Sequence, residues 1–294
     1  MNTNAEYDIV FLGNYTKDTI VSSAGKRIVD GGAFNYGSHV AARMGLRTAA
    51  ITRLATEDFH VLRELEQLGV TVFAHPAQAS TCLRLEYPTS DVDDRIIFVL
   101  SSAGPLSPAA VRAVQAKAYV VGASFRGEVG LDVIAELNRK EALLAADVQG
   151  FIRLVRDGKL VPEPWPEKQA VLSRINVLKS DAVEAELLTG STDIRKAAQM
   201  MADSGPSEVM ITHRKGVLVY AFGEFHEAGF FPEKLIGRSG RGDTCIASYV
   251  SRRLTVPPEE ATVWAAAVAS LKMEAEGPFR RDIRAVEMLI ERKY

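Results

Sequence analysis

Short apolar runs rich in β-branched residues alternate along the chain with longer stretches of helical period. Strands buried on both faces give such runs and the helices that cover them give amphipathic stretches, so this alternation predicts a parallel sheet covered by helices. The predicted strands are residues 8–12, 48–51, 118–121, 143–147, 177–179, 209–212 and 217–220. The clearest predicted helices are residues 35–44, 59–68, 108–115, 130–139, 181–189, 194–204, 243–253 and 258–275.

Two stretches interrupt this rhythm, at residues 19–30 and 72–100. In the second, the alternation across residues 82–86 is typical of antiparallel strands exposed on one face. We predict that both stretches form a small accessory sheet that serves as a lid or a dimer surface, and surface hairpins are the alternative. The proline-rich residues 161–166 are predicted to form a surface loop, because strand and helix patterns continue on both sides.

The composition is that of a folded globular protein, with 47% hydrophobic and 24% charged residues. A formal net charge of -2 provides no long-range field to attract nucleic acid or an anionic membrane. The two cysteines cannot form a disulfide framework, and the five histidines show no metal-ligand spacing. The apolar residues 261–271 are fewer than the ~20 that cross a bilayer, and no leader pattern precedes the first strand. We therefore expect a cytoplasmic protein without nucleic-acid or membrane partners.

The strongest chemical signal is a glycine-rich turn that leads directly into an apolar helix, Gly240-Arg241-Gly242-Asp243. Such a turn lets backbone N–H groups converge, and together with the positive end of the helix they form a site for phosphate. We predict that the helix end keeps Asp243 ionised beside this site, so that it accepts a proton from an attacking hydroxyl. The alternative is that Asp243 only caps the helix and the glycines only form a tight turn.

A second signal lies in residues 30–45, where Gly31 and Gly32 precede Asn35 and a helical pattern. Adjacent glycines allow a polar ligand to approach the backbone, and the Asn35 amide both donates and accepts hydrogen bonds. A plain helix cap is the alternative for Asn35. The chain has no Gly-x-x-x-x-Gly-Lys-Ser/Thr phosphate loop, no Gly-x-Gly-x-x-Gly after the first strand and no Gly-x-Ser-x-Gly elbow, which weakens P-loop, dinucleotide and hydrolase interpretations.

Together, the two segments resemble the paired signatures of the PfkB or ribokinase-like carbohydrate kinases, which are Gly-Gly-x-x-Asn near the N-terminus and Gly-x-Gly-Asp near the C-terminus. Their order and spacing match along nearly the whole chain. The resemblance implies an α/β fold of the ribokinase-like three-layer α/β/α type, with a mostly parallel central sheet and a small β-sheet lid in one domain of residues 1–294. It also implies a kinase that uses ATP and Mg²⁺.

The resemblance assigns roles to individual residues. Asp243 matches the catalytic base, and the backbone of Gly240, Arg241 and Gly242 matches the anion hole. The positions that match substrate-contacting residues are Asp18, Gly31, Gly32 and Asn35. For these four residues, a strand-end turn and a helix cap are the alternative.

On the donor side, the resemblance implies nucleotide-binding and magnesium-binding positions. They are Asp181, Glu184, Thr212, Gly216 and Gly277. In this family the residue matched by Glu184 organises magnesium and phosphate through water, and Asp181 replaces an asparagine. Thr212 and Gly216 bound a nucleotide-contacting turn that lacks its usual glycine, and Gly277 falls where the family closes its adenine pocket. A capped surface helix at Glu184 and a helix end at Gly277 are the alternatives.

Two departures from the family pattern affect the chemistry. Gly237-Arg238 stand where the family often has Asp-Thr, whose aspartate helps to bind a monovalent cation, so potassium activation is left open. Arg241 stands where a small alanine is usual. Its guanidinium either contacts phosphate in the transition state or points into solvent.

Asp147 and Arg153 follow a predicted strand at the edge where open α/β sheets bind ligands, so we predict that they bind substrate. An exposed salt bridge in a loop is the alternative. With residues 12–15 and 31–33, this segment looks more like the myo-inositol kinase branch than like ribokinase or fructokinase.

The predicted reaction is transfer of the γ-phosphoryl group of ATP to a hydroxyl of a sugar, a cyclitol such as myo-inositol, or a nucleoside. The alternatives are a catalytically silent sensor that binds polyol or nucleotide on the same fold, and a hydrolase or synthase that acts on a phosphorylated metabolite. A homodimer through the lid would cover an exposed sheet edge.

Overall fold

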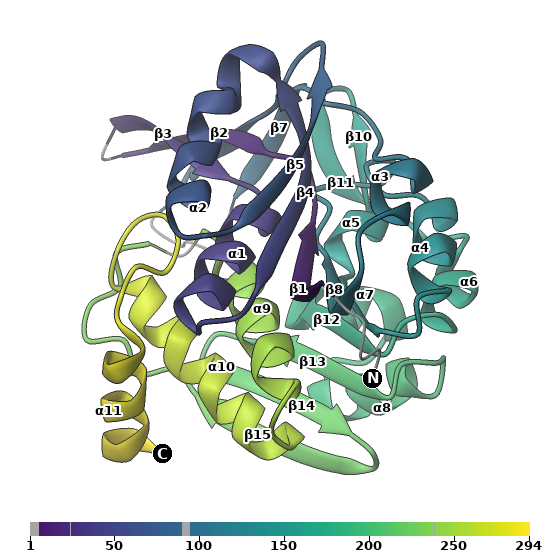
Figure 1. Cartoon of the computed structure of the whole chain (residues 1–294). Coiled ribbons are helices and arrows are strands. Elements are labelled where there is room, and N and C mark those ends of the chain that lie inside the picture. The colour runs from purple at the N-terminus through teal and green to yellow at the C-terminus, as the bar shows by residue number, and fades with distance from the viewer. Residues whose placement is uncertain (1–5, 24, 90–94, 238) are drawn as a thin grey trace.

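The computed structural model describes residues 6–23, 25–89, 95–237 and 239–294, and it contains two β-sheets of different size (Figure 1). Over these residues, the larger sheet has nine strands in the order β15-β14-β13-β12-β9-β8-β1-β4-β5. Its strands are β1 (Tyr7–Leu12), β4 (Thr48–Ala55), β5 (Thr71–Ala77), β8 (Ala116–Val121), β9 (Leu143–Asp147), β12 (Val177–Asp181), β13 (Glu208–Thr212), β14 (Gly216–Ala221) and β15 (Glu224–Gly229). The pairs β13–β14 and β14–β15 are antiparallel and the other pairs are parallel, so the sheet is mostly parallel.

Helices cover both faces of the large sheet (Figure 1). On one face lie α1 (Ala33–Arg43), α2 (Arg63–Gln67), α9 (Arg241–Arg253), α10 (Pro258–Met273) and α11 (Ile283–Lys293). On the other lie α3 (Pro108–Arg112), α4 (Leu131–Asn138), α6 (Lys168–Leu172), α7 (Ala182–Thr189) and α8 (Ile194–Ala202). The short α5 (Gln149–Ile152) and the 3₁₀-helix η1 (Thr56–Leu62) occupy connections. The result is the three-layer α/β/α arrangement of ribokinase-like proteins.

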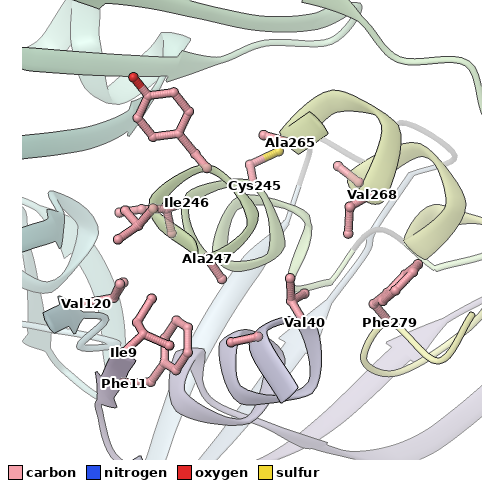
Figure 2. Packing of buried hydrophobic residues seen from close by; sticks show 14 of the residues in the cluster. Ile9, Phe11, Val40, Val120, Cys245, Ile246, Ala247, Ala265, Val268 and Phe279 are labelled. Carbon is pink, nitrogen blue, oxygen red and sulfur yellow. The ribbon is translucent and has the colours of Figure 1, made fainter. Parts of the chain in front are cut away.

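The apolar strands supply both layers because successive side chains of a strand point to opposite faces. Ile9 and Phe11 of β1 join the hydrophobic core under α1 and α9, whereas Val10 and Leu12 join the core on the other face. Figure 2 shows the first core, in which side chains of α9 pack between β1, α1 and α10. Gly37 lets α1 approach closely, since a Cβ there would lie 2.3 Å from the Phe11 ring. This packing brings the N-terminal ends of α1 and α9 together.

The smaller sheet lies at one side of the large one (Figure 1) and has the strand order β10-β11-β7-β6-β2-β3. Its strands are β2 (Thr16–Ser22), β3 (Gly25–Gly31), β6 (Thr81–Glu86), β7 (Ile96–Ser101), β10 (Arg153–Arg156) and β11 (Lys159–Pro162). The pair β2–β6 is parallel and the remaining pairs are antiparallel. Leu83 and Leu85 of this sheet pack with Phe125 of the body in a small separate cluster.

The structure corrects the predicted accessory sheet in two places. Strand β5, at the start of the predicted segment 72–100, belongs to the large sheet and pairs in parallel with β4. It is an edge strand, and its partial exposure resembles the pattern of a half-buried antiparallel strand. Strands β10 and β11 were not predicted, and β11 takes up part of the predicted loop 161–166. Residues 24 and 90–94 of the predicted segments lie outside the described residues.

The C-terminal α11 was not among the predicted helices, although Val286 and Leu289 bury its apolar face against the core. The predicted helix 59–68 is shorter than expected, because its first part is the 3₁₀-helix η1 and only α2 is α-helical. Within the described part of the chain, no helix combines the length and apolar character needed to span a membrane.

Candidate active site

A cavity of about 250 Å³ lies between the two sheets. Its walls are formed by the carboxyl ends of β9, β12 and β13, the N-terminal ends of α1 and α9, and the inner face of the small sheet. This is the edge at which open α/β sheets bind ligands. The predicted site residues that line it are Asp18, Gly32, Asp147, Arg153, Asp181, Thr212, Gly240, Arg241, Gly242 and Asp243.

The glycine-rich turn meets the cavity at the N-terminus of α9. Gly240 is the residue before the helix and has φ 76°, a left-handed conformation that favours glycine. A Cβ there would lie 2.3 Å from the Tyr36 ring, so a larger residue would displace that ring. The first N–H groups of a helix have no partner within it, so the N-terminus of α9 at the cavity wall is a candidate anion site.

Lys179 adds a positive charge to this turn. A Cβ on Gly242 would lie 2.7 Å from the Lys179 Nζ, which shows how closely the ammonium approaches the backbone of the turn. Its Nζ also lies 2.7 Å from Oδ2 of Asp147. Burial opposes charge on Lys179, but the carboxylates of Asp147, Glu184 and Asp181 outweigh it and raise the pKa of the lysine. The ammonium therefore remains charged beside the glycines.

Asp243 lies in the first turn of α9 and lines the cavity. Burial raises the pKa of its carboxyl, and the nearby cations Lys179 and Arg153 oppose that change. Burial is the largest influence on this pKa, and the prediction that the helix end keeps Asp243 ionised stays a prediction. A carboxylate with a raised pKa is a stronger base toward a hydroxyl than an ordinary aspartate.

Asp18, on β2, is the second carboxylate of the cavity. Burial raises its pKa to about 6, a hydrogen bond from Thr16 opposes the change, and the charge of Asp243 adds to it. Among the described residues, the Asp18 Oδ1 and the Tyr36 hydroxyl oxygen are buried without a hydrogen-bond partner. Both side chains line the cavity, so they offer unsatisfied polar atoms to a ligand with hydroxyl groups.

Gly31 and Gly32 allow the chain to pass close to Asp18. A Cβ on Gly31 would lie 2.6 Å from the Asp18 Oδ2, and Gly32 has φ 96° with no room for a side chain beside the Asn14 carbonyl. Gly31 itself does not line the cavity. Asn35 does not line it either, and its Nδ2 donates to the carbonyl oxygen of Asp30 at 3.2 Å.

Asp147 is buried and Arg153 is partly buried, and the two are not paired with each other. Asp147, 1% exposed, pairs with Lys179, and burial raises its pKa to about 6 against the effect of that ammonium. Arg153 pairs with Glu184, with 2.8 Å between Nη2 and Oε1. The alternative of an exposed salt bridge in a loop is therefore wrong for both residues.

Glu184 stands behind Arg153 and does not line the cavity. Its second oxygen, Oε2, accepts a hydrogen bond from the backbone N–H of Asp181 at 2.9 Å. Asp181 in turn accepts a hydrogen bond from the Glu184 N–H and caps α7. Both oxygens of Glu184 are thus engaged by protein groups, and its carboxylate orients Arg153 toward the cavity.

Two glycines expected on the donor side lie away from the cavity. Gly216 is packed in the β14–β15 pair, where a Cβ would lie 2.3 Å from the Ala228 carbonyl oxygen. Gly277 has φ 76° and turns the chain after α10. Thr212, by contrast, ends β13 and lines the cavity.

Arg241 lines the cavity, and its guanidinium carbon lies 5.5 Å from the centre of the Phe230 ring. Arg95, the residue before the small-sheet strand β7, also lines the cavity, and its charge lowers the pKa of both Asp18 and Asp243. Neither Lys179 nor Arg95 was predicted as a site residue. The signal for Lys179 is a charged residue in the buried part of strand β12, and Arg95 gives no comparable signal.

Comparison with known proteins identifies the family of this chain. The model of the pfkB family carbohydrate kinases matches residues 23–280. The chain belongs to the pfkB family of carbohydrate kinases. A pyrophosphate-dependent kinase of the ribokinase family, solved with sulfate, is 35% identical with a TM-score of 0.89, covering 94% of this chain and 99% of that one.

Two further relatives differ in what they bind or phosphorylate. A structure of a pyrophosphate-dependent kinase with a pyrophosphate analog and myo-inositol is 34% identical with a TM-score of 0.88, covering 94% of this chain and 99% of that one. A cytidine kinase of Thermococcus kodakarensis is 24% identical over 254 residues, which are 83% of this chain and 87% of that protein. The relative solved with myo-inositol agrees with the resemblance to the myo-inositol kinase branch of the family.

Proposed function

We propose that this pfkB family kinase transfers a phosphoryl group to a hydroxyl of a small polyol, with Asp243 as the catalytic base. The observation that carries the proposal is the position of Asp243, which lies in one cavity with the open polar atoms of Asp18 and Tyr36 and with the glycine turn beside Lys179. A sugar, a cyclitol such as myo-inositol, or a nucleoside has the required hydroxyl. The myo-inositol complex of a 34% identical relative favours a cyclitol.

In the proposed mechanism, Asp18 and Tyr36 bind hydroxyl groups of the acceptor and orient one of them toward Asp243. Asp243 takes the proton of that hydroxyl as its oxygen attacks the phosphorus atom in line with the leaving group. The amides of the α9 turn and the Lys179 ammonium stabilise the negative charge on the migrating group. The apolar side chains of the small sheet, including Leu83 and Leu85, exclude water that would compete as the acceptor.

For the donor, we propose inorganic pyrophosphate in preference to the ATP expected from the family resemblance. The cations Arg153, Lys179 and Arg241 line one cavity and suit a small, highly charged donor. Gly216 and Gly277, the positions expected to contact a nucleotide, do not line it. Relatives at 35% and 34% identity are pyrophosphate-dependent kinases.

We expect Mg²⁺ to bind together with either phosphate donor. In the described part of the chain, no group of three or more candidate ligands could hold a metal ion by itself. Magnesium is commonly held by substrate phosphates, water and one or two carboxylates, and Asp181 at the cavity wall fits that role. Glu184 would act on the donor phosphates indirectly, by holding the guanidinium of Arg153. When bound, Mg²⁺ would neutralise charge on the donor.

A matrix of donors and acceptors tests this proposal. Pyrophosphate and ATP, each with Mg²⁺, are supplied with myo-inositol, simple sugars and cytidine, and the phosphorylated acceptor is measured by mass spectrometry. We expect product from pyrophosphate and a cyclitol, with kcat/KM for ATP lower by about tenfold or more, a difference of ~1.4 kcal/mol in transition-state binding. Product from ATP alone would refute the donor assignment. Polyol binding without product from any donor would favour the silent sensor.

The paired carboxylates predict an acidic limit to the activity. The pKa of Asp18 is raised to about 6, so Asp18 takes up a proton as the pH falls through that value and becomes a weaker acceptor of a hydroxyl hydrogen bond. We expect kcat/KM to fall below about pH 6. Because Asp18 and Asp243 repel each other, Asp18→Asn should lower the pKa of Asp243 and move the remaining acidic limb to lower pH. A pH profile of kcat/KM for both proteins checks this, and an unshifted limb would contradict it.

A further inference from the structure

Lys272 is a buried lysine in the last turn of α10, outside the cavity, and its side chain reaches the loop that precedes α9. Its Nζ donates a hydrogen bond to the carbonyl oxygen of Gly237 at 2.9 Å and another to the carbonyl oxygen of Ser239. The ammonium also lies 5.5 Å from the centre of the Tyr36 ring. Its partners are therefore carbonyl oxygens and an aromatic face, with the side chain only 2% exposed.

The ammonium is buried without a close counter-charge. Across the described residues, no carboxylate forms a salt bridge with Lys272, and burial lowers its pKa to about 8 while Glu276 and Asp243 oppose the change from farther away. An unpaired buried charge costs several kcal/mol, and a packed apolar side chain would avoid that cost. Carbonyl oxygens and the ring compensate part of it. A group retained at such a cost points to a function rather than to stability alone.

The loop that Lys272 holds leads directly into the anion site. The N–H groups of Ile236 and Gly237 donate to the Met273 carbonyl oxygen at 2.9 and 3.0 Å, so the loop is tied to the end of α10. Gly237 is packed so tightly that a Cβ would lie 2.3 Å from the Ala275 carbonyl oxygen. Ser239, the second carbonyl partner of Lys272, is followed by Gly240, which lies against Tyr36. The ammonium thus fixes the backbone just before the amides of Gly240 to Gly242.

We infer that the Lys272 ammonium takes the place of a bound monovalent cation, coordinating the carbonyl oxygens before α9 so that the amides of the turn stay aimed at the migrating phosphoryl group. Carbonyl oxygens are also the ligands that replace the hydration shell of K⁺ in proteins, and an ammonium group supplies the same charge to them. Lys272 is a positioning residue, since it acts through the backbone carbonyl groups of Gly237 and Ser239. The inference rests on the proposed function, and it makes the native enzyme independent of added potassium.

Two variants of Lys272 test this inference. Lys272→Ala removes the ammonium and leaves space, whereas Lys272→Met removes the charge but fills the space. In choline chloride we expect each variant to have a kcat about 10²-fold lower than that of the native enzyme. This is the loss expected when one N–H donor of an anion site no longer points at the migrating group. K⁺ or NH₄⁺ at the same ionic strength should restore at least a tenth of the native kcat to Lys272→Ala and nothing to Lys272→Met. The native enzyme should show equal kcat in all three salts.

Thermal unfolding supplies a readout that needs no turnover. K⁺ and NH₄⁺ should raise the midpoint of Lys272→Ala by about 2 °C or more over choline, because an ion that binds only the folded chain stabilises it. The native protein and Lys272→Met should show no such rise.

The midpoint also distinguishes the two proposals. If the native protein has no kinase activity but K⁺ still raises the midpoint of Lys272→Ala, the proposed function fails while the cation site stands. Native kcat in the alanine variant without K⁺, or a folded alanine variant that neither ion restores or stabilises, would overturn the inference. If Lys272→Ala does not fold in choline, recovery of folded protein in K⁺ would support the inference, and failure to recover it would contradict the inference.

Discussion

Replacing Asp243 with asparagine is expected to lower kcat by about 10²- to 10⁴-fold, the contribution of a positioned general base. The variant keeps the shape of the side chain but cannot take the proton of the acceptor hydroxyl. Its KM for the donor should change little, because the turn amides and Lys179 that face the donor remain in place. Steady-state kinetics with the best donor and acceptor pair, measured well above pH 6, provides the check.

Stability and a second carboxylate serve as controls for this variant. Burial raises the pKa of Asp243, so the folded chain disfavours its charge, and the asparagine variant should be at least as stable as the native protein at pH 8. Asp18→Asn should raise the KM for the acceptor more than it lowers kcat, since Asp18 lines the cavity as a hydroxyl acceptor. Near-native kcat in Asp243→Asn would remove Asp243 from the role of base.

Replacing Lys179 with methionine is expected to reduce both stability and activity. The change leaves Asp147 buried without its partner, and breaking a buried ion pair in this way costs about 3–5 kcal/mol of unfolding free energy. It also removes the ammonium beside Gly242, which we expect to lower kcat/KM for the donor by about 10²- to 10³-fold. Denaturant unfolding and steady-state kinetics measure the two effects on the same preparation.

Two matched variants separate these effects. Adding Asp147→Asn to Lys179→Met removes the orphaned charge, so most of the lost stability should return while the activity stays low. Arg253→Met breaks another ion pair, between the partly buried Arg253 and the buried Glu208, at the far end of α9. It should cost stability but leave kcat/KM near the native value. An active Asp147→Asn/Lys179→Met double variant would show that Lys179 serves the fold alone.

Local sequence pattern predicts the parts of this fold that are buried on both faces. The strand at residues 177–179 forms in β12, and the glycine turn before Asp243 forms at the N-terminus of α9. Patterns at the borders of the sheets are less decisive. The edge strand β5 is partly exposed, and it was assigned to the wrong sheet because neither burial nor alternation is complete there.

The candidate site depends on partners that are distant along the chain, which limits prediction from local motifs. Tyr36 reaches the cavity because α1 packs beside α9, and Arg95 reaches it because the adjoining strand β7 belongs to the small sheet that borders the cavity. Conversely, Gly216 matches a position of a family motif, but it packs within the β14–β15 pair and does not line the cavity. Sequence identifies which residue types are available for the reaction, and the tertiary contacts decide which of them meet.

The position of Arg153 joins the two sheets mechanically. It is the first residue of β10, an outer strand of the small sheet, and its guanidinium is held by Glu184 at the start of α7 in the body. A tilt of the small sheet on binding of the acceptor would therefore move this guanidinium, which we propose to contact the donor. Occupancy by one reactant would in this way change the affinity for the other, and thermodynamic reciprocity requires the same factor in both directions.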